Sequence, residues 1–303
     1  MGSGHNHTTN NNRTRLLVAL IITVSVVVAQ AIGAIVTGSL ALLVDTAHML
    51  TDSAGLLMAL LAAGLMQRPV TDKHSWGLRR TEVLSAMAQS SLLFAVGIYA
   101  LIEGIRRLFD TPEIHAGSLL IFGIIGLLAN IAAMIVLTGG RNSNLNMKAA
   151  FLEVVNDGLG SVAVILSAVL IAAFGWYQAD AVAGILIALL IVPRTIILLK
   201  ASLGVLLEST PKGIDPEDVR AHIMEMAHVT DVHDLHITRI SSDLPVLTAH
   251  VIVEDSCFID GHAAEMLPAL QKCVAEHFAL SIEHSTFQIE PESNVNREHV
   301  RHH

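Results

Sequence analysis

Residues 117–140, GSLLIFGIIGLLANIAAMIVLTGG, form an apolar segment without a charged side chain, and this segment decides the class of fold. A helix needs about 20 apolar residues to cross the hydrocarbon core of a bilayer. Residues 16–36 and 83–102 are equally free of charge and of similar length. The three segments are typical of membrane-spanning helices, so the chain is predicted to be an integral membrane protein.

Three further segments complete the predicted membrane region. Residues 40–66 and 149–174 are apolar except for a few ionisable side chains. Residues 181–199 predict a sixth span, which Pro193 and Arg194 are expected to break near its end. Six spans make an all-α bundle and leave both termini on the same side of the membrane.

Lysine and arginine are unevenly divided between the two sets of loops. Ten of them occupy the N-terminal tail, the second–third and fourth–fifth loops and the end of the sixth span, whereas the opposite loops contain Arg106 and Arg107. Cytoplasmic loops are enriched in these residues. The bias predicts a multi-pass protein of the inner (plasma) membrane with both termini cytoplasmic.

The charge of the chain changes sharply after residue 207. Residues 1–207 have a net charge of +2 (12 Lys/Arg, 10 Asp/Glu) and residues 208–303 a net charge of −11 (6 and 17), which sum to −9. This division excludes a single homogeneous domain, a disordered chain and a strongly basic nucleic-acid-binding protein. We predict four parts: a polar tail at 1–15, a transmembrane domain at 16–207, a soluble domain at 208–292 and a C-terminal tail at 293–303.

Ionisable side chains occur in pairs inside two of the predicted spans. His48 and Asp52 are four residues apart, as are Glu153 and Asp157, so each pair shares one helix face. Charged groups at membrane depth are costly and mark functional sites. Together the pairs offer one imidazole and three carboxylates, a ligand set that suits a first-row divalent metal such as Zn²⁺. The alternative is that the pairs hold the bundle together by hydrogen bonds.

The same residues also bind protons, and metal binding requires deprotonated ligands. Metal and protons therefore compete for one site. If this site opens alternately to each side of the membrane, the competition results in exchange of metal for protons, which is antiport. Asp45, one turn before His48, is either a proton relay, an additional ligand or a partner in a polar contact.

Four motifs carry a resemblance to a known family. They are SLALLVDTAHMLTD (39–52), RPVTDKHSWGLRRTEVLSA (68–86), LNMKAAFLEVVNDGLGSVAV (145–164) and LLESTPKGID (206–215). They resemble the cation diffusion facilitator family, in particular its zinc-exporting branch. The resemblance implies six spans, a cytoplasmic ferredoxin-like domain, a homodimer joined through that domain, and exchange of a divalent metal, zinc first, for protons.

The chain departs from the family pattern in its fifth span. His48 and Asp52 match the motif of the second span, but Glu153 stands where zinc-selective relatives usually have histidine. A hard oxygen in place of a borderline nitrogen is expected to relax the preference for zinc towards Cd²⁺, Co²⁺, Mn²⁺ or Fe²⁺.

Two other histidine-containing segments give weaker signals. Asp72 and His74 lie in a loop where some relatives bind a second metal, but Leu78 fills the position of the second histidine, so at most a weak site is expected. The histidines of the tails either collect metal transiently or are remnants of a tag; they are His5, His7, His299, His302 and His303.

The sequence of the soluble part is amphipathic, whereas the predicted spans are apolar on all sides. Residues 214–229 predict a helix with Asp215 as N-cap and Pro216 in its first turn. Alternating patterns predict strands at 232–243, 245–255 and 284–291, with a second helix at 260–279. The order αββαβ is that of an α+β sandwich with helices on one face.

The resemblance also implies a metal site in this domain, formed by His233, His250, His262 and Glu290, at which zinc acts as a regulatory ligand. The alternative is that these histidines are solvated surface residues. We expect inert packing for Cys257 and Cys273, which lack a CxxC spacing, and a solvated surface for His222, His228, His236, His277 and His284.

Two other classes of function are alternatives to a metal/proton antiporter, and each would need particular sequence features. An intramembrane metalloenzyme would need an activated water and a general base, and the sequence has neither HExxH nor GxSxG. A membrane-anchored metal sensor would not need ligand pairs inside its spans. We therefore predict a secondary transporter with no organic cofactor and no nucleic-acid partner.

Overall fold

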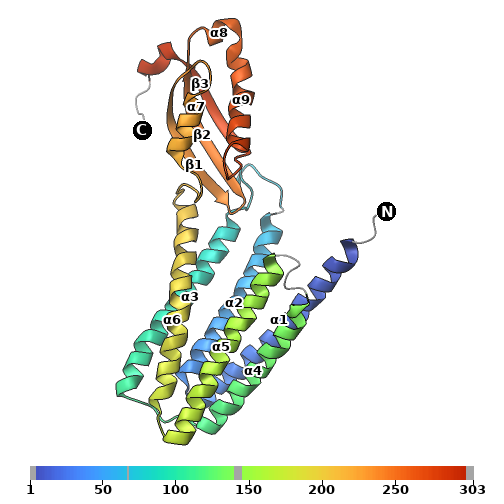
Figure 1. Cartoon of the computed structure of the whole chain (residues 1–303), viewed down its shortest axis with the longest axis vertical. Helices are drawn as coiled ribbons and strands as arrows, with labels where there is room; N and C mark the ends of the chain where they lie inside the picture. Colours follow the sequence, from blue (N-terminus) through green and yellow to red (C-terminus); the bar gives the residue numbers. More distant parts are fainter. Residues whose placement is uncertain (1–4, 67, 140–144, 298–303) are drawn as a thin grey trace. The chain divides into compact units, whose positions relative to one another are not determined.

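The computed structural model describes residues 5–66, 68–139 and 145–297. Its first part consists of long helices (Figure 1). They are α1 (His5–Thr37), α2 (Leu40–Met66), α3 (Thr81–Phe109), α4 (Ala116–Thr138), α5 (Leu145–Phe174) and α6 (Gln178–Leu206).

Five of these helices are long and apolar enough to cross a membrane, judged over the described residues. They are α1 from Val18, α3, α4, α5 from Phe151, and α6. Large apolar side chains point outward from them, for example Ile35 at 84% and Leu190 at 70% exposure. Such a surface suits lipid rather than water, so the helical membrane region predicted from the sequence is confirmed.

The predicted break near the end of the sixth span is wrong, because α6 continues through Pro193 and Arg194 to Leu206. Proline removes one backbone donor, but membrane helices tolerate this residue where neighbouring groups satisfy the freed carbonyl. Arg194 also has a partner inside the bundle, described below, which removes the reason for ending the helix there.

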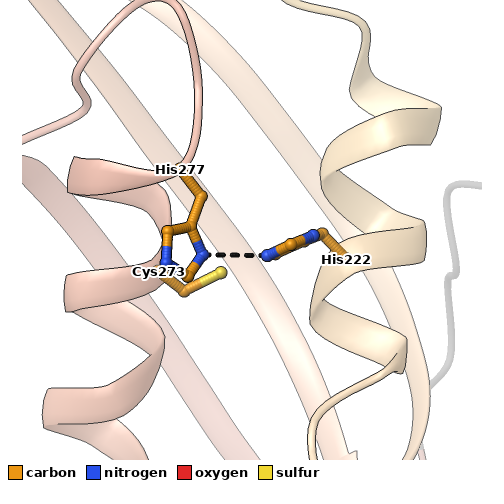
Figure 2. Close-up of side chains that lie close together, drawn as sticks. All are labelled: His222, Cys273 and His277. Atoms are coloured by element: carbon orange, nitrogen blue, oxygen red, sulfur yellow. Dashed lines mark hydrogen bonds between the residues drawn. The ribbon is translucent and has the colours of Figure 1, made fainter.

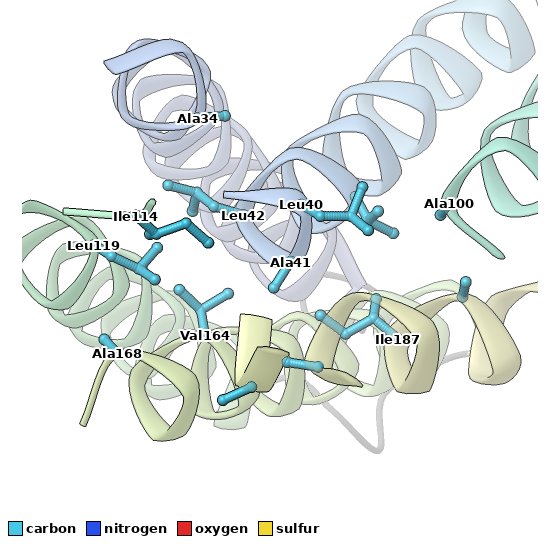
Figure 3. Packing of buried hydrophobic residues seen from close by; sticks show 14 of the residues in the cluster. Ala34, Leu40, Ala41, Leu42, Ala100, Ile114, Leu119, Val164, Ala168 and Ile187 are labelled. Carbon is cyan, nitrogen blue, oxygen red and sulfur yellow. The ribbon is translucent and has the colours of Figure 1, made fainter. Parts of the chain in front are cut away.

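Small and branched residues form the buried contact between the helices (Figure 3). Leu40 and Ala41 of α2 pack in one cluster with Val164 and Ala168 of α5 and Ile187 of α6. Helices pack in membranes mainly by close van der Waals contact, which small side chains permit. This cluster therefore fixes α2 against α5, the two helices that carry the paired ionisable residues.

Asp180, at the start of α6, anchors the beginning of α2. Its fully buried carboxylate accepts hydrogen bonds from the Ser39 hydroxyl and, at 2.6 Å and 3.4 Å, from the backbone N–H groups of Leu40 and Ala41. The first N–H groups of a helix have no partner within the helix. The Asp180 carboxylate satisfies two of them and so fixes the depth of α2.

The C-terminal part contains a small mixed sheet with helices. Its elements are α7 (Pro216–Met224), β1 (Val229–Ser241), β2 (Leu244–Val253), α8 (Cys257–Asp260), α9 (His262–Glu276), β3 (His284–Pro291) and the 3-10 helix η1 (Glu292–Arg297). The strand order is β1-β2-β3, with β1 antiparallel and β3 parallel to β2. The predicted order of helices and strands is confirmed, and Asp215 caps α7 by accepting from the Glu217 N–H at 3.0 Å.

One apolar core joins this sheet to its helices. Alternate residues of β2, including Leu247 and Val251, pack with Val219 of α7 and with Leu270 and Val274 of α9. Because the core residues of β2 lie two apart, they share one face of the sheet. Both helices therefore cover the same face, as the αββαβ order predicts.

The chain divides into two compact units, and the second combines the sheet domain with residues 60–87. Within this unit the ring of Trp76 packs edge-on against His284 at the start of β3, with centroids 4.8 Å apart. Arg80 pairs with Glu208 at 2.8 Å. The segment before α3 is thus held by the residues around the sheet.

Candidate functional site

The structure brings the two pairs of ionisable residues together. One ligand atom from each of His48, Asp52, Glu153 and Asp157 can be chosen so that all four lie within 4.8 Å of one another. His48 and Asp52 come from α2, and Glu153 and Asp157 from α5. The i,i+4 spacing places each pair on one face, and the α2–α5 packing makes the two faces meet.

The imidazole of His48 approaches two of the three carboxylates. Its Nδ1 is 3.5 Å from the Asp52 carboxylate and its Nε2 is 3.7 Å from the Glu153 carboxylate. The Gln89 amide of α3 donates to the other oxygen of Asp52 at 3.4 Å. The Gln89 side chain thus helps to orient the Asp52 carboxylate.

Several atoms of the group are buried without a hydrogen bond. Asp157 Oδ1, Asp52 Oδ2 and His48 Nδ1 have no hydrogen-bond partner among the described residues. A buried polar group without a partner is unstable. Two of these atoms, His48 Nδ1 and Asp52 Oδ2, face each other at 3.5 Å without a hydrogen bond, and Asp157 belongs to the same group of possible ligands. Such atoms are expected where a cation or protons complete a site.

A small cavity borders the group. Its volume is about 90 Å³, and its wall includes Asp52, Glu153 and Asp157 together with Thr23 of α1 and Ser53 of α2. This space is large enough for a water molecule or a partly hydrated ion next to the carboxylates. The cavity therefore provides space directly next to the carboxylates of the group.

Arg194 contacts the group, and the sequence alone did not indicate this contact. Its guanidinium on α6 binds both oxygens of Glu153, at 2.7 Å and 3.1 Å. Two parallel hydrogen bonds from a guanidinium to one carboxylate give an ion pair of defined geometry, and the Arg194 side chain is half exposed. The positive charge offsets the extra carboxylate that Glu153 brings. The signal in the sequence was an arginine inside an apolar span in a chain with unpaired intramembrane acids.

Asp45 lies outside the four-residue group. It is buried and accepts a hydrogen bond from the Gln30 amide of α1 at 2.9 Å. Its other oxygen lies against Gly160 of α5, where a larger residue would not fit. The geometry shows a polar contact between α1 and α2 at Asp45, and the roles of relay or additional ligand stay predictions.

Part of the predicted site in the sheet domain also comes together. His233 and His250 are paired across β1 and β2, with ring centroids 5.1 Å apart. His250 Nδ1 lies 3.2 Å from the Glu290 carboxylate on β3. Asp234, which the sequence reasoning did not single out, completes a group of three possible ligands with His233 and His250. His233 is buried, so it is not a solvated surface residue.

His262 is not part of this group. Its Nδ1 lies 2.8 Å from the Asp260 carboxylate, and its ring lies 5.4 Å from that of His228. Hydrogen bonding to Asp260 raises the pKa of His262 and lowers the pKa of Asp260. The sequence reasoning joined His262 to the strands on the family pattern, whereas in the single chain it starts α9 with partners of its own.

The loop residues show no comparable grouping. His74 approaches the Thr71 hydroxyl at 3.5 Å, and both His74 and Asp72 are exposed. Neither belongs to a group of three possible ligands among the described residues. The tail histidines lie outside the residues whose side chains the structure describes.

Comparison with known proteins identifies the family. A family model described as the cation efflux transmembrane domain matches residues 16–207. The metal cation efflux system protein CzcD of Cupriavidus metallidurans is 40% identical over 291 residues, which cover 96% of this chain and 90% of the relative.

Two further relatives cover the same extent. The zinc transporter ZitB of Escherichia coli K12 is 37% identical, and the cadmium, cobalt and zinc/H(+)-K(+) antiporter of Bacillus subtilis 168 is 36% identical. Each alignment covers 96% of this chain and 93% of the relative. The chain therefore belongs to the cation diffusion facilitator family of transporters, of the zinc, cobalt and cadmium efflux type.

Proposed function

We propose that the chain exports divalent metal ions from the cytoplasm in exchange for protons, with zinc as the first substrate. The transport site consists of His48, Asp52, Glu153 and Asp157. The observation that carries the proposal is the convergence of these four side chains, with buried atoms that lack a hydrogen bond. The names of the relatives, zinc transporter and cadmium, cobalt and zinc antiporter, support the same substrates.

The ligand set explains how one site exchanges metal for protons. An imidazole nitrogen and three carboxylate oxygens bind Zn²⁺ tetrahedrally when deprotonated. Histidine and carboxylates take up protons when the metal leaves, because buried charges without partners are unstable. The same atoms therefore hold either cargo, and occupancy by one excludes the other.

Arg194 gives Glu153 an alternative partner. The guanidinium donates to both Glu153 oxygens at hydrogen-bonding distance. A metal ion that binds Glu153 must compete with this ion pair, so release of the metal is assisted by return of Arg194. Arg194 is therefore proposed as a positioning residue that weakens metal binding enough for turnover.

Transport by reconstituted protein tests the site. In proton-loaded vesicles, Asp157→Ala is expected to abolish zinc-dependent proton flux, since it removes one of the four proposed ligands. The matched control is Asp110→Ala, an exposed carboxylate outside the group, which retains flux. Undiminished flux in Asp157→Ala overturns the assignment of the site. Absence of flux in the wild type, with zinc bound by the sheet domain, instead favours a membrane-anchored sensor.

The membrane topology belongs to the same proposal. Six spans, α1–α6, place both termini in the cytoplasm of an inner-membrane protein, with the transmembrane domain at 16–207 and the sheet domain at 208–292. The length of α2, 27 residues, supports counting it as a span although it carries three ionisable residues. Protease digestion of sealed inside-out vesicles is expected to remove an epitope at either terminus. Protection of one terminus would require an odd number of spans.

We further propose that the sheet domain is ferredoxin-like, joins two chains into a homodimer and binds regulatory zinc at His233, His250 and Glu290. The mixed sheet with both helices on one face supports this fold. His262 has its own partner in the single chain, so it would join the site from the second chain. Chemical cross-linking in vesicles tests the dimer, which should tighten with zinc and lose that response in His250→Ala.

A further inference from the structure

A second set of metal-binding side chains lies between the two helices of the sheet domain (Figure 2). His222 comes from α7, and Cys273 and His277 come from α9. None of the three belongs to the transport site or to the group around His233. They were expected to be a solvated pair of histidines and an inert thiol.

The three side chains point toward a common centre. His222 Nε2 and His277 Nδ1 are 2.8 Å apart and share a hydrogen bond, and the two rings are 4.9 Å apart between centroids. Ligand atoms of all three residues lie within 4.8 Å of one another. Cys273 and His277 are four residues apart on α9, so they share a helix face.

We propose that His222, Cys273 and His277 form a binding site for a thiophilic divalent metal, Zn²⁺ or the related Cd²⁺ and Co²⁺. Two imidazoles and one thiolate are a ligand set that these ions prefer. Cys273 is buried whereas His277 is exposed, so the metal would lie at the domain surface with the thiol on its inner side. The fourth coordination position would then be open to solvent.

The distances require little rearrangement. Zinc–nitrogen bonds of about 2.0–2.1 Å in a tetrahedron separate two ligand nitrogens by roughly 3.3 Å. The two nitrogens must therefore move apart by roughly half an ångström from their hydrogen-bonded distance. Cys273 Sγ lies within 4.8 Å of a ring nitrogen of each histidine and must also move to coordinating distance.

The proton balance is also simple. Each neutral imidazole carries one proton, and in the metal-free site one of the two facing nitrogens donates that proton to the other. When the metal binds, this proton moves to the far nitrogen of the same ring. The thiol of Cys273 loses its proton to solvent, so binding of one metal ion releases one proton.

A metal bound by these three side chains would join α7 to α9. The alternative is a purely structural role, in which the hydrogen bond between the two imidazoles joins the helices and the thiol only packs nearby. The two roles can be distinguished by measurement, because only in a metal site is the Cys273 thiolate bound to the metal.

Co²⁺ tests the site because its absorption spectrum reports a thiolate ligand. The chain has two cysteines, so replacing each in turn identifies which one binds. The full-length, reduced protein in detergent is titrated with Co²⁺, and a thiolate-to-cobalt charge-transfer band is expected in the near ultraviolet. The nitrogen and oxygen ligands of the other sites give no such band. Cys273→Ser should abolish the band, and the matched control Cys257→Ser, which removes the other buried thiol, should retain it.

Protection from alkylation provides a second readout that does not depend on a variant of the thiol. Zn²⁺ is expected to slow modification of Cys273 about tenfold or more without an equal effect on Cys257. His222→Gln should reduce this protection while leaving the rate in the absence of zinc within a factor of about two. Absence of the cobalt band in the wild type, or a band that survives Cys273→Ser, overturns the proposal.

Discussion

At the scale of single residues, the pairing of Glu153 with Arg194 is the main departure from a simple four-ligand site. A carboxylate adds a charge to the empty site, and the guanidinium on α6 neutralises it through two hydrogen bonds. We therefore expect selectivity and turnover to depend on two residues from different helices rather than on Glu153 alone.

Replacing Arg194 by Gln should strengthen metal binding, since the metal no longer competes with an ion pair for Glu153. We expect KM for zinc to fall roughly tenfold, equivalent to about 1.4 kcal/mol, and the maximal rate to fall because release slows. Initial rates of transport in vesicles check this split. Arg106→Gln, which removes an exposed arginine, is the control, and a higher KM in Arg194→Gln would contradict the competition.

Replacing Glu153 by His should sharpen the preference for zinc over manganese and iron, because a borderline nitrogen replaces a hard oxygen. The change also deprives Arg194 of its partner, so the double variant with Arg194→Gln is needed for comparison. A panel of metals in proton-loaded vesicles measures the effect. Unchanged ratios in both variants would show that Glu153 does not set selectivity.

The Asp260–His262 pair gives a local dependence on pH. Since the pKa of His262 is raised, its contribution to stability is present below the ordinary histidine value and is lost as the pH rises through the raised value. For Asp260, whose pKa is lowered, the contribution is lost as the pH falls through that lowered value. NMR titration of the metal-free protein should find the pKa of His262 closer to that of free histidine in Asp260→Asn.

At the scale of elements, the fixed start of α2 determines where its ligands lie. An α-helix is a rigid element that rises about 1.5 Å per residue. If its start at Ser39 moved along the helix axis, His48 and Asp52 would move with it by the same amount. Asp180 prevents this by capping the helix from α6.

Asp180→Ala should therefore destabilise the bundle. Leaving buried donors without a partner costs about 1–3 kcal/mol, and we expect a lower Tm for the detergent-solubilised protein. Asp180→Asn should lie between this variant and the wild type, because an amide oxygen still accepts a hydrogen bond. An exposed control, Glu113→Ala, should melt like the wild type; equal Tm values for all would argue against the cap.

At the scale of the whole molecule, the sequence predicts what depends on local periodicity. The i,i+4 spacing was enough to expect that His48 and Asp52 share a face, and alternation was enough to find β1 and β2. Contacts between distant residues leave no such trace. Arg194 pairs with Glu153 over 41 positions and Asp180 with Leu40 over 140, so neither partner was predictable from spacing.

The same reason accounts for the error at Pro193 and for the missed cluster in the sheet domain. A proline rule applied to a soluble helix predicts a break, but the environment of a membrane span changes its outcome. The spacing of Cys273 and His277 predicts that they share a helix face. The third possible ligand, His222, lies 55 positions from His277, and without it the pair alone does not indicate a metal site.

The Arg194–Glu153 pair has an electrical consequence for the transport cycle. With neutral His48, three carboxylates and one guanidinium leave the empty site at a formal charge of −2, and either one divalent ion or two protons bring it to zero. Moving a charge across the membrane costs about 2.3 kcal/mol per 100 mV, but a carrier that is neutral in both loaded forms escapes this cost. Zinc flux should then be insensitive to an imposed potential, and a flux that scales with voltage would require a different exchange ratio.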